Sequence, residues 1–196
     1  NSMLVHVSRF TNLHQQCGRL IGTYLDQVSR PIKAFAKLNN PEGQSDVVTD
    51  FRITFERRLA SAIEGESWQS VLATVADILD SVVIREVHKD TKIPLVYRSD
   101  AVTNAIVIGG ASLSRGFTLV GLSVSYFLRT AVFYDTLMQM GRWFGYRPGY
   151  SDLCRLYSTP ELIRWYAHIT LANEELMELY LGGEELPTFV DAYCLR

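Results

Sequence analysis

The fold is decided by residues 105–157, AIVIGGASLSRGFTLVGLSVSYFLRTAVFYDTLMQMGRWFGYRPGYSDLCRLY. Two apolar segments of this stretch, Ala105–Ile108 and Leu122–Phe127, are short and rich in β-branched and aromatic residues. Glycine, serine and arginine bound them, which is typical of strands that are buried on both faces. We therefore predict that both segments lie in one parallel sheet.

The loop between these two strands, GGASLSRGFTL, predicts a site for a polyanion. It follows the end of a strand, and open α/β sheets bind their ligands at the carboxyl ends of their strands. Glycines let backbone N–H groups approach a phosphate closely, and hydroxyl and guanidinium groups add further donors. The side chains that supply those donors are Ser112, Ser114, Arg115 and Thr118.

The next segment, YDTLMQMGRWFGYR, predicts a helix that is followed by a loop with two arginines. Asp135 is a plausible N-cap because an apolar helical pattern follows it. Arg142 and Arg147 lie beside glycines and aromatic residues. Guanidinium groups bind phosphate oxygens with two parallel hydrogen bonds and stay charged at any working pH. A surface ion pair is the alternative role for either arginine.

The order of these motifs resembles motifs V and VI in the second RecA-like domain of superfamily-two helicases and translocases. The shared features are a strand, an R-G-x-T loop, a second strand and a helix that ends in Q-x-G-R-(x)4-R. More narrowly, GGASLSRGFTLVGLSVSYFLR and YDTLMQMGRWFGYRPGY are similar to the Z-one domain, a bacterial family often described as an endonuclease domain. That family accompanies helicase-like ATPase subunits of ATP-dependent restriction systems.

The resemblance implies an α/β, RecA-like doubly wound domain, with a mostly parallel sheet and helices on both faces. It also implies the second half of a two-lobed motor, in which ATP with Mg²⁺ lies between this domain and a P-loop domain. Arg142 or Arg147 would then act as an arginine finger, and Gln139 would position the nucleotide. Residues Arg115, Gly116 and Thr118 would couple the nucleotide to the nucleic acid.

The first strand and its turn predict a second phosphate contact. Met3–Val7 has strand character, and a polar turn leads from it into an amphipathic helix. A strand that feeds a helix N-terminus is a phosphate site by geometry. The resemblance assigns this turn to motif IV, which touches the DNA backbone. The expected DNA contacts are Ser8, Arg9, Thr11, Asn12, Gly109, Gly110, Ser112 and Ser114. Helix capping by Thr11 or Asn12 is the alternative.

Helical periodicity marks most of the remaining chain. The first helix carries Leu13, Cys17, Leu20, Ile21, Tyr24, Leu25 and Val28 at helical spacing. Residues 31–49 read as a loop, 50–63 and 68–79 as helices, 81–87 and 152–157 as strands. A last helix runs from Pro160 to Gly182, with Thr159 as its N-cap and Trp165, Ile169 and Leu176 on its core face. We expect one domain over residues 1–196, with a helical insertion or covering layer at about residues 31–80.

Composition limits the classes of protein to which the chain can belong. A net charge of −2 gives no global basic signature, so contacts with nucleic acid must come from a local patch. No P-loop motif and no long apolar run occurs in the sequence. We therefore expect a cytoplasmic domain excised from a larger protein, whose partners are a P-loop domain of the same chain, the DNA backbone and a separate nuclease subunit. The fragment alone should hydrolyse nothing.

Two other functions stay open. Asp80, Glu86 and Lys89 weakly match the acidic D…E-x-K pattern of metal-dependent nucleases, although Glu86 and Lys89 are one residue too far apart and would lie on opposite faces of a strand. The three cysteines are too few and too widely spaced for a zinc site, and we expect no metal site. The second alternative is a catalytically silent RecA-like interaction module.

Overall fold

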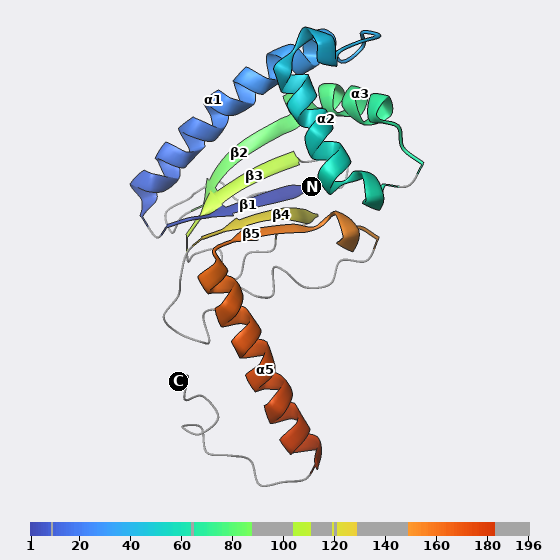
Figure 1. Cartoon of the computed structure of the whole chain (residues 1–196). Helices are drawn as coiled ribbons and strands as arrows, with labels where there is room; N and C mark the ends of the chain where they lie inside the picture. The colour runs from blue at the N-terminus through green and yellow to red at the C-terminus, as the bar shows by residue number, and fades with distance from the viewer. Residues whose placement is uncertain are drawn as a thin grey trace, which may run out of the picture.

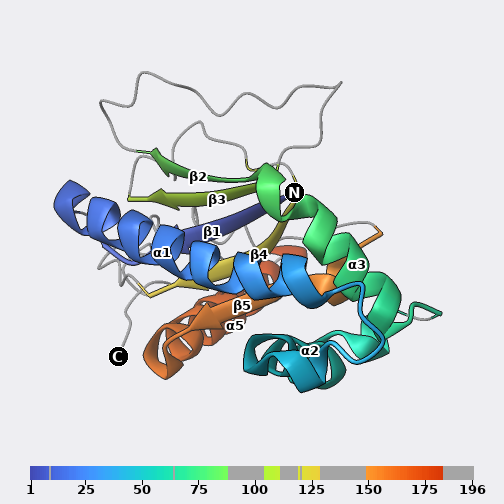
Figure 2. The same ribbon diagram turned by 90° about the horizontal axis from the view of Figure 1, so that it is seen from above.

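The computed structural model of the chain describes residues 1–8, 10–63, 65–87, 104–110, 119, 121–128 and 149–182. Its five strands form one sheet in the order β2-β3-β1-β4-β5, and every pair of neighbours is parallel (Figure 2). The strands are β1 (Ser2–His6), β2 (Val82–Val87), β3 (Asn104–Gly109), β4 (Leu122–Phe127) and β5 (Arg155–Ser158). The predicted α/β fold with a parallel sheet is therefore confirmed.

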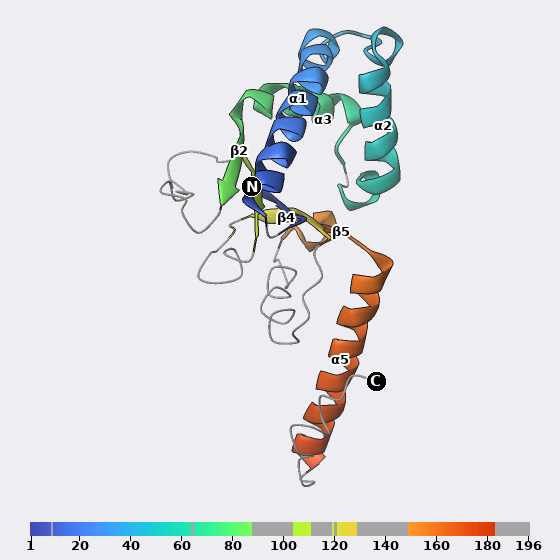
Figure 3. The same ribbon diagram turned by 90° about the vertical axis from the view of Figure 1, so that its left-hand side faces the viewer.

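Helices cover both faces of this sheet, as Figures 1 and 3 show. The helices α1 (Thr11–Phe35), α2 (Asp46–Arg58) and α3 (Trp68–Ile78) lie on one face, and α5 (Pro160–Gly182) lies on the other. Three short 3-10 turns, Glu42–Gln44, Ala60–Ala62 and Leu79–Ser81, flank α2 and follow α3. A fourth, Ser151–Leu153, precedes β5.

The core has two parts, one for each layer. The first joins the α5 face of the sheet to α5 and includes Leu4, Val107, Phe127, Leu162 and Ile169, all of which are almost fully buried. The second lies among the three helices of the other face and consists of Val28, Ile32, Ala36, Val48, Leu72 and Ala76. Because β1 is the central strand, both of its faces are covered, as its nearly continuous apolar sequence predicts.

Helix α1 departs from the prediction in two ways. It continues through Pro31 to Phe35, where we expected a loop from residue 31 onward. The burial of Ile32 and Ala36 in the helical cluster offsets the hydrogen bond that proline cannot donate. In addition, not all of the apolar residues that mark the helix are buried, since Leu20 and Tyr24 are 71% and 61% exposed.

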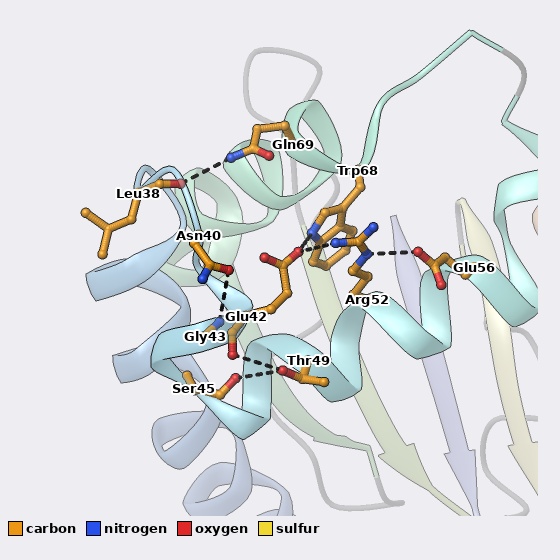
Figure 4. Close-up of polar contacts among 10 residues, drawn as sticks. All are labelled: Leu38, Asn40, Glu42, Gly43, Ser45, Thr49, Arg52, Glu56, Trp68 and Gln69. Carbon is orange, nitrogen blue, oxygen red and sulfur yellow. Dashed lines mark hydrogen bonds and ion pairs between the residues drawn. The ribbon is translucent and has the colours of Figure 1, made fainter.

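A polar cluster centred on Glu42 ties the helices of this layer together (Figure 4). The Glu42 carboxylate accepts hydrogen bonds from Nε1 of Trp68 at 2.6 Å and from Nη1 of Arg52 at 3.0 Å. Arg52 also donates to the Glu56 carboxylate at 2.8 Å. A hydrogen bond with its own backbone, followed by those from Trp68 and Arg52, lowers the pKa of the Glu42 carboxyl against the opposing effect of desolvation. The cluster therefore holds the middle of α2, through Arg52, and the start of α3, through Trp68, to one anionic group.

Helix α5 begins as predicted and packs differently from the prediction. The Leu162 N–H donates to Oγ1 of Thr159 at 3.2 Å, so the expected cap is confirmed. Leu162 and Ile169 are buried against the sheet, but Trp165 is 40% exposed and does not belong to the core face. Burial raises the pKa of Tyr166, which packs edge-on against Phe127, to about 12.

None of the helices that the structure describes has the length and apolar character needed to cross a membrane.

Candidate phosphate-binding site at the carboxyl end of β1

The connections that follow the neighbouring strands β1 and β4 lead to opposite sides of the sheet. From β1 the chain goes to β2 on one side of the sheet, whereas from β4 it goes to β5 on the other side. All five strands are parallel, so their carboxyl ends share one edge. Open α/β sheets bind ligands where neighbouring connections diverge in this way. The edge beside β1 is therefore where a ligand site is expected.

The turn from β1 into α1 is built on Ser8. Its hydroxyl accepts a hydrogen bond from the Phe10 N–H at 3.1 Å. Phe10 is the N-cap of α1 and has an extended backbone, and the Phe10 carbonyl accepts from the N–H groups of Leu13 and His14 at 3.1 and 3.3 Å. The Ser8 side chain thus fixes the direction in which the helix starts. Its lone pair, rather than its proton, is used in that contact, so the hydroxyl hydrogen stays available for an outside acceptor.

The start of α1 presents polar groups that suit an anion. The N-cap of α1 is Phe10, so neither Thr11 nor Asn12 occupies the N-cap position that the capping alternative gave them. Asn12 Oδ1 accepts from the Leu13 N–H at 3.0 Å, which leaves its amide N–H₂ group directed elsewhere. The N–H groups of Thr11 and Asn12 lie in the first turn, where a helix offers no intrahelical acceptor. With the positive end of the helix dipole, these donors favour a bound oxyanion.

His14 of α1 packs against the turn, and no sequence motif pointed to it. The side chain is 1% exposed, and its Nε2 lies 2.9 Å from the Ser8 carbonyl oxygen. A carbonyl can only accept, so Nε2 carries the proton in this contact. Nδ1 of His14 is buried and has no hydrogen-bond partner among the described residues. His14 therefore links the first turn of α1 to the end of β1 through Nε2, and its Nδ1 is not used in this contact.

Gly110, the residue after β3, lies in close contact with the same turn. A Cβ atom at this position would lie 3.2 Å from Cε1 of His14 and 3.3 Å from the Ser8 carbonyl oxygen. Such contacts are tighter than most side chains make, so glycine at position 110 favours the close approach of the backbone after β3 to the β1 turn. The predicted Ser8 and Gly110 thus lie together, with His14 between them.

The structure places five of the predicted contact residues at this edge: Ser8, Thr11, Asn12, Gly109 and Gly110. Gly109 is the last residue of β3 and pairs with Val87. The other predicted site residues lie outside the described part of the chain and stay predictions. They are Arg9, Ser112, Ser114, Arg115, Gly116, Thr118, Gln139, Arg142 and Arg147.

Two residues of the nuclease-like pattern, Asp80 and Glu86, lie in the described part of the chain. Asp80 forms an ion pair with Lys33 of α1, on the surface of the helical layer. Glu86 lies on β2 with its carboxylate against α1, where a Cβ on Gly18 would come 2.9 Å from Oε1. Lys89 lies outside the described residues. In the part of the chain that the structure describes, no group of three or more His, Cys, Asp or Glu residues is arranged to hold a metal ion.

Comparison with known protein families identifies the chain. The model of the Z1 domain matches residues 1–181, which is most of the sequence. The chain belongs to the Z1 domain family. The match includes β1, the turn at Ser8 and the loop after β3, so the whole candidate site lies within the Z1 domain. No curated protein and no solved structure matches the chain.

Proposed function

We propose that this Z1 domain is the second motor domain of a DNA-dependent ATPase, a helicase-like translocase of a restriction or phage-defence system. In this role it holds the DNA backbone and supplies an arginine finger to a nucleotide bound by a P-loop domain of the same protein. A separate nuclease subunit would be the partner that cuts the DNA.

One observation carries the proposal. Gly110, the first residue after β3, lies against Ser8 and His14 of the turn after β1, at the carboxyl edge of a parallel sheet. The sequence of the β3 loop continues into the R-G-x-T motif, so the same edge combines a helix N-terminus with the loop that resembles motif V. A motor domain needs this arrangement, because its nucleotide loop and its DNA contacts must respond to each other.

The roles follow from the chemistry of each group. Ser8, Thr11, Asn12 and the glycine backbone of the β3 loop donate hydrogen bonds to DNA phosphates, which positions the strand without reading its sequence. Arg9, Ser112 and Ser114 add to this contact. ATP with Mg²⁺ is held mainly by the P-loop domain, while Arg115, Gly116 and Thr118 link the nucleotide to the DNA. Gln139 positions the nucleotide, and Arg142 or Arg147 stabilises the charge that develops on the γ-phosphate.

The test is DNA-stimulated ATP hydrolysis by the protein that contains this chain and its P-loop domain. We compare Arg142→Ala and Arg147→Ala with the wild type, and use Arg30→Ala, an exposed arginine on α1, as the matched control. Loss of an arginine finger lowers the rate about 10³- to 10⁵-fold. One of the two variants should show such a loss with nucleotide binding retained, and Arg30→Ala should show none. Unchanged hydrolysis in both variants would refute the proposed motor role.

A further inference from the structure

Two tyrosines lie side by side and exposed on the sheet. Tyr126 is in β4, and Tyr157 is its partner in the register of β5. Their ring centroids are 6.3 Å apart, with an angle of 38° between the ring planes. The residues are 39% and 38% exposed. The rings contact each other in a tilted arrangement, and more than a third of the surface of each residue faces solvent.

The helices that the structure describes leave this part of the sheet partly exposed. Phe127 points to the α5 face, where it packs against Tyr166. Because side chains alternate along a strand, Tyr126 and its partner Tyr157 point to the opposite face, which carries α1, α2 and α3. Helix α1 packs on β2 and β3 at the other side of the sheet. At the β4–β5 side, the end of α2 approaches through Arg58, whose guanidinium carbon lies 5.8 Å from the centre of the Tyr157 ring.

The open aromatic surface is positively charged. Arg57 and Arg58 end α2, and both are exposed. Arg155 of β5 holds the last residue of α2 to the strand, since its guanidinium donates to the Arg58 carbonyl oxygen and, at 2.6 and 2.9 Å, to the carbonyl oxygens of Asp152 and Cys154. The Arg155 guanidinium thus bonds backbone carbonyl groups, while the Arg58 guanidinium lies next to the Tyr157 ring. We call Tyr126, Tyr157 and Arg58 the tyrosine patch.

We infer that the tyrosine patch binds the bases of single-stranded nucleic acid. Every base has a flat π-face that stacks on an aromatic ring, whereas a duplex hides those faces between its base pairs. An arginine beside the rings supplies the charge that the phosphate backbone requires. The combination of exposed rings with guanidinium groups therefore favours an unpaired strand over a duplex.

The position of the patch agrees with this ligand. The register pairs His6 with Phe127, and Phe127 with Ser158, so both tyrosines lie one residue before the carboxyl ends of their strands. Neighbouring strands are about 4.8 Å apart, which places the tyrosines about 5 and 10 Å from β1 across the sheet. A single nucleic-acid strand can therefore place its phosphates at the Ser8 turn and its bases on the tyrosine patch. The inference rests on the proposed function in so far as the polymer is DNA, and adds that the bound form is single-stranded.

The experiment measures binding of the chain to a fluorescently labelled oligothymidine of roughly 20 nucleotides, longer than the usual site of one small domain, and to a duplex of equal length. Variants Tyr126→Ala and Tyr157→Ala should each bind the single strand about 5- to 150-fold more weakly, the range that loss of one stacked base produces. Tyr126→Phe and Tyr157→Phe keep the ring and should bind as the wild type does. Tyr24→Ala removes a tyrosine that is 61% exposed on α1, and should have no effect.

Arg58 has a separate readout. If its guanidinium neutralises one phosphate, Arg58→Gln should lower the slope of log affinity against log salt by about 0.7 for a single strand. The inference is overturned if the alanine variants bind the single strand as the wild type does, if the phenylalanine variants lose as much as the alanine variants, or if the wild type prefers the duplex. Circular dichroism confirms that each variant is folded. Binding is measured without ATP, so a negative result leaves the hydrolysis test of Arg142 and Arg147 unaffected.

Discussion

Replacing Gly110 with alanine tests the contact on which the candidate site depends. The new methyl carbon would lie 3.2 Å from Cε1 of His14 and 3.3 Å from the carbonyl oxygen of Ser8. Neither neighbour can easily move, because the His14 ring is buried and bonded to that same carbonyl, which belongs to the backbone. Overpacking of this kind costs about 1 to 3 kcal/mol. Alanine restricts the unfolded chain and returns about 0.4 to 1 kcal/mol, so we expect a net loss of roughly 1.3 kcal/mol, in a range of about 0 to 2.6 kcal/mol.

Gly22→Ala is the matched control, because the same substitution should have the opposite sign there. Gly22 lies inside α1, and a Cβ would come no closer than 3.6 Å to Cδ1 of Ile84, which is an ordinary contact. Alanine is better than glycine in a helix interior by about 1 kcal/mol. The two variants differ from the wild type by the same methyl group, so their difference reports the surroundings alone.

Urea unfolding followed by circular dichroism measures both effects. The double variant His14→Ala with Gly110→Ala adds a coupling test, since removal of the ring relieves one of the two close contacts. We expect the two substitutions to be non-additive by about 0.5 kcal/mol or more, in the direction of a smaller combined loss. If Gly110→Ala is as stable as the wild type while Gly22→Ala gains stability, the β3 loop does not lie against the Ser8 turn and the candidate site is wrong.

Three further predictions concern single groups. Glu42→Gln should lower the free energy of unfolding by about 1 to 3 kcal/mol, because it weakens hydrogen bonds to a charged acceptor. Glu56→Gln, at a carboxylate that is 54% exposed, should change it much less in the same urea titration. Since the folded pKa of Glu42 is lowered, its contribution is present above the unfolded pKa of about 4.3 and is lost as pH falls through the folded pKa. The difference between wild type and Glu42→Gln should therefore shrink in acid, and a constant difference from pH 7 to pH 3 would contradict this cause. Asn12→Asp should stabilise α1 by about 0.3 to 1 kcal/mol through the helix dipole, yet weaken DNA binding by repelling phosphate; tighter binding in a filter assay would exclude the turn as a phosphate contact. Thr159→Ala should cost about 1 kcal/mol in thermal unfolding, because α5 loses its cap, whereas Thr170→Ala on the exposed side of the same helix should not.

The strands could be predicted from the sequence because each is a short apolar run with punctuation at both ends. Leu122–Phe127 has the expected bounds, and the other strands differ by a few residues. The order of the strands in the sheet could not be predicted from the sequence. It depends on which distant segments pair, and β1 pairs with β3 across about a hundred residues of chain. Local patterns carry no record of such a pairing, although they restrict its handedness and direction.

The exposure of Leu20 and Tyr24, two apolar residues of the α1 pattern, has a physical cause. Hydrophobic periodicity selected Leu20 and Tyr24, which are large and exposed, because it ranks residues by the apolar area they could bury. The side of α1 that meets the sheet is occupied at its start by His14, Gly18 and Gly22. Glycines there bring the helix close to Ile84 and Ile108. Close approach between backbone and sheet is a steric property, and it has no apolar signature in a sequence.

The same limit explains why the sequence predicted the two loops of the site but not what joins them. Ser8 and Gly110 could each be proposed from local chemistry, as a polar turn and a glycine after a strand. Their contact requires that Leu4 pairs with Val107 and Val5 with Ile108, since a register one residue longer or shorter would turn the other faces of the strands to the core. Leu4 and Val107 are both fully buried, so the packing of the sheet fixes this register. The geometry of the candidate site is therefore a consequence of the core beneath it, and a core substitution such as Leu4→Ala should disturb phosphate binding without touching any residue of the turn.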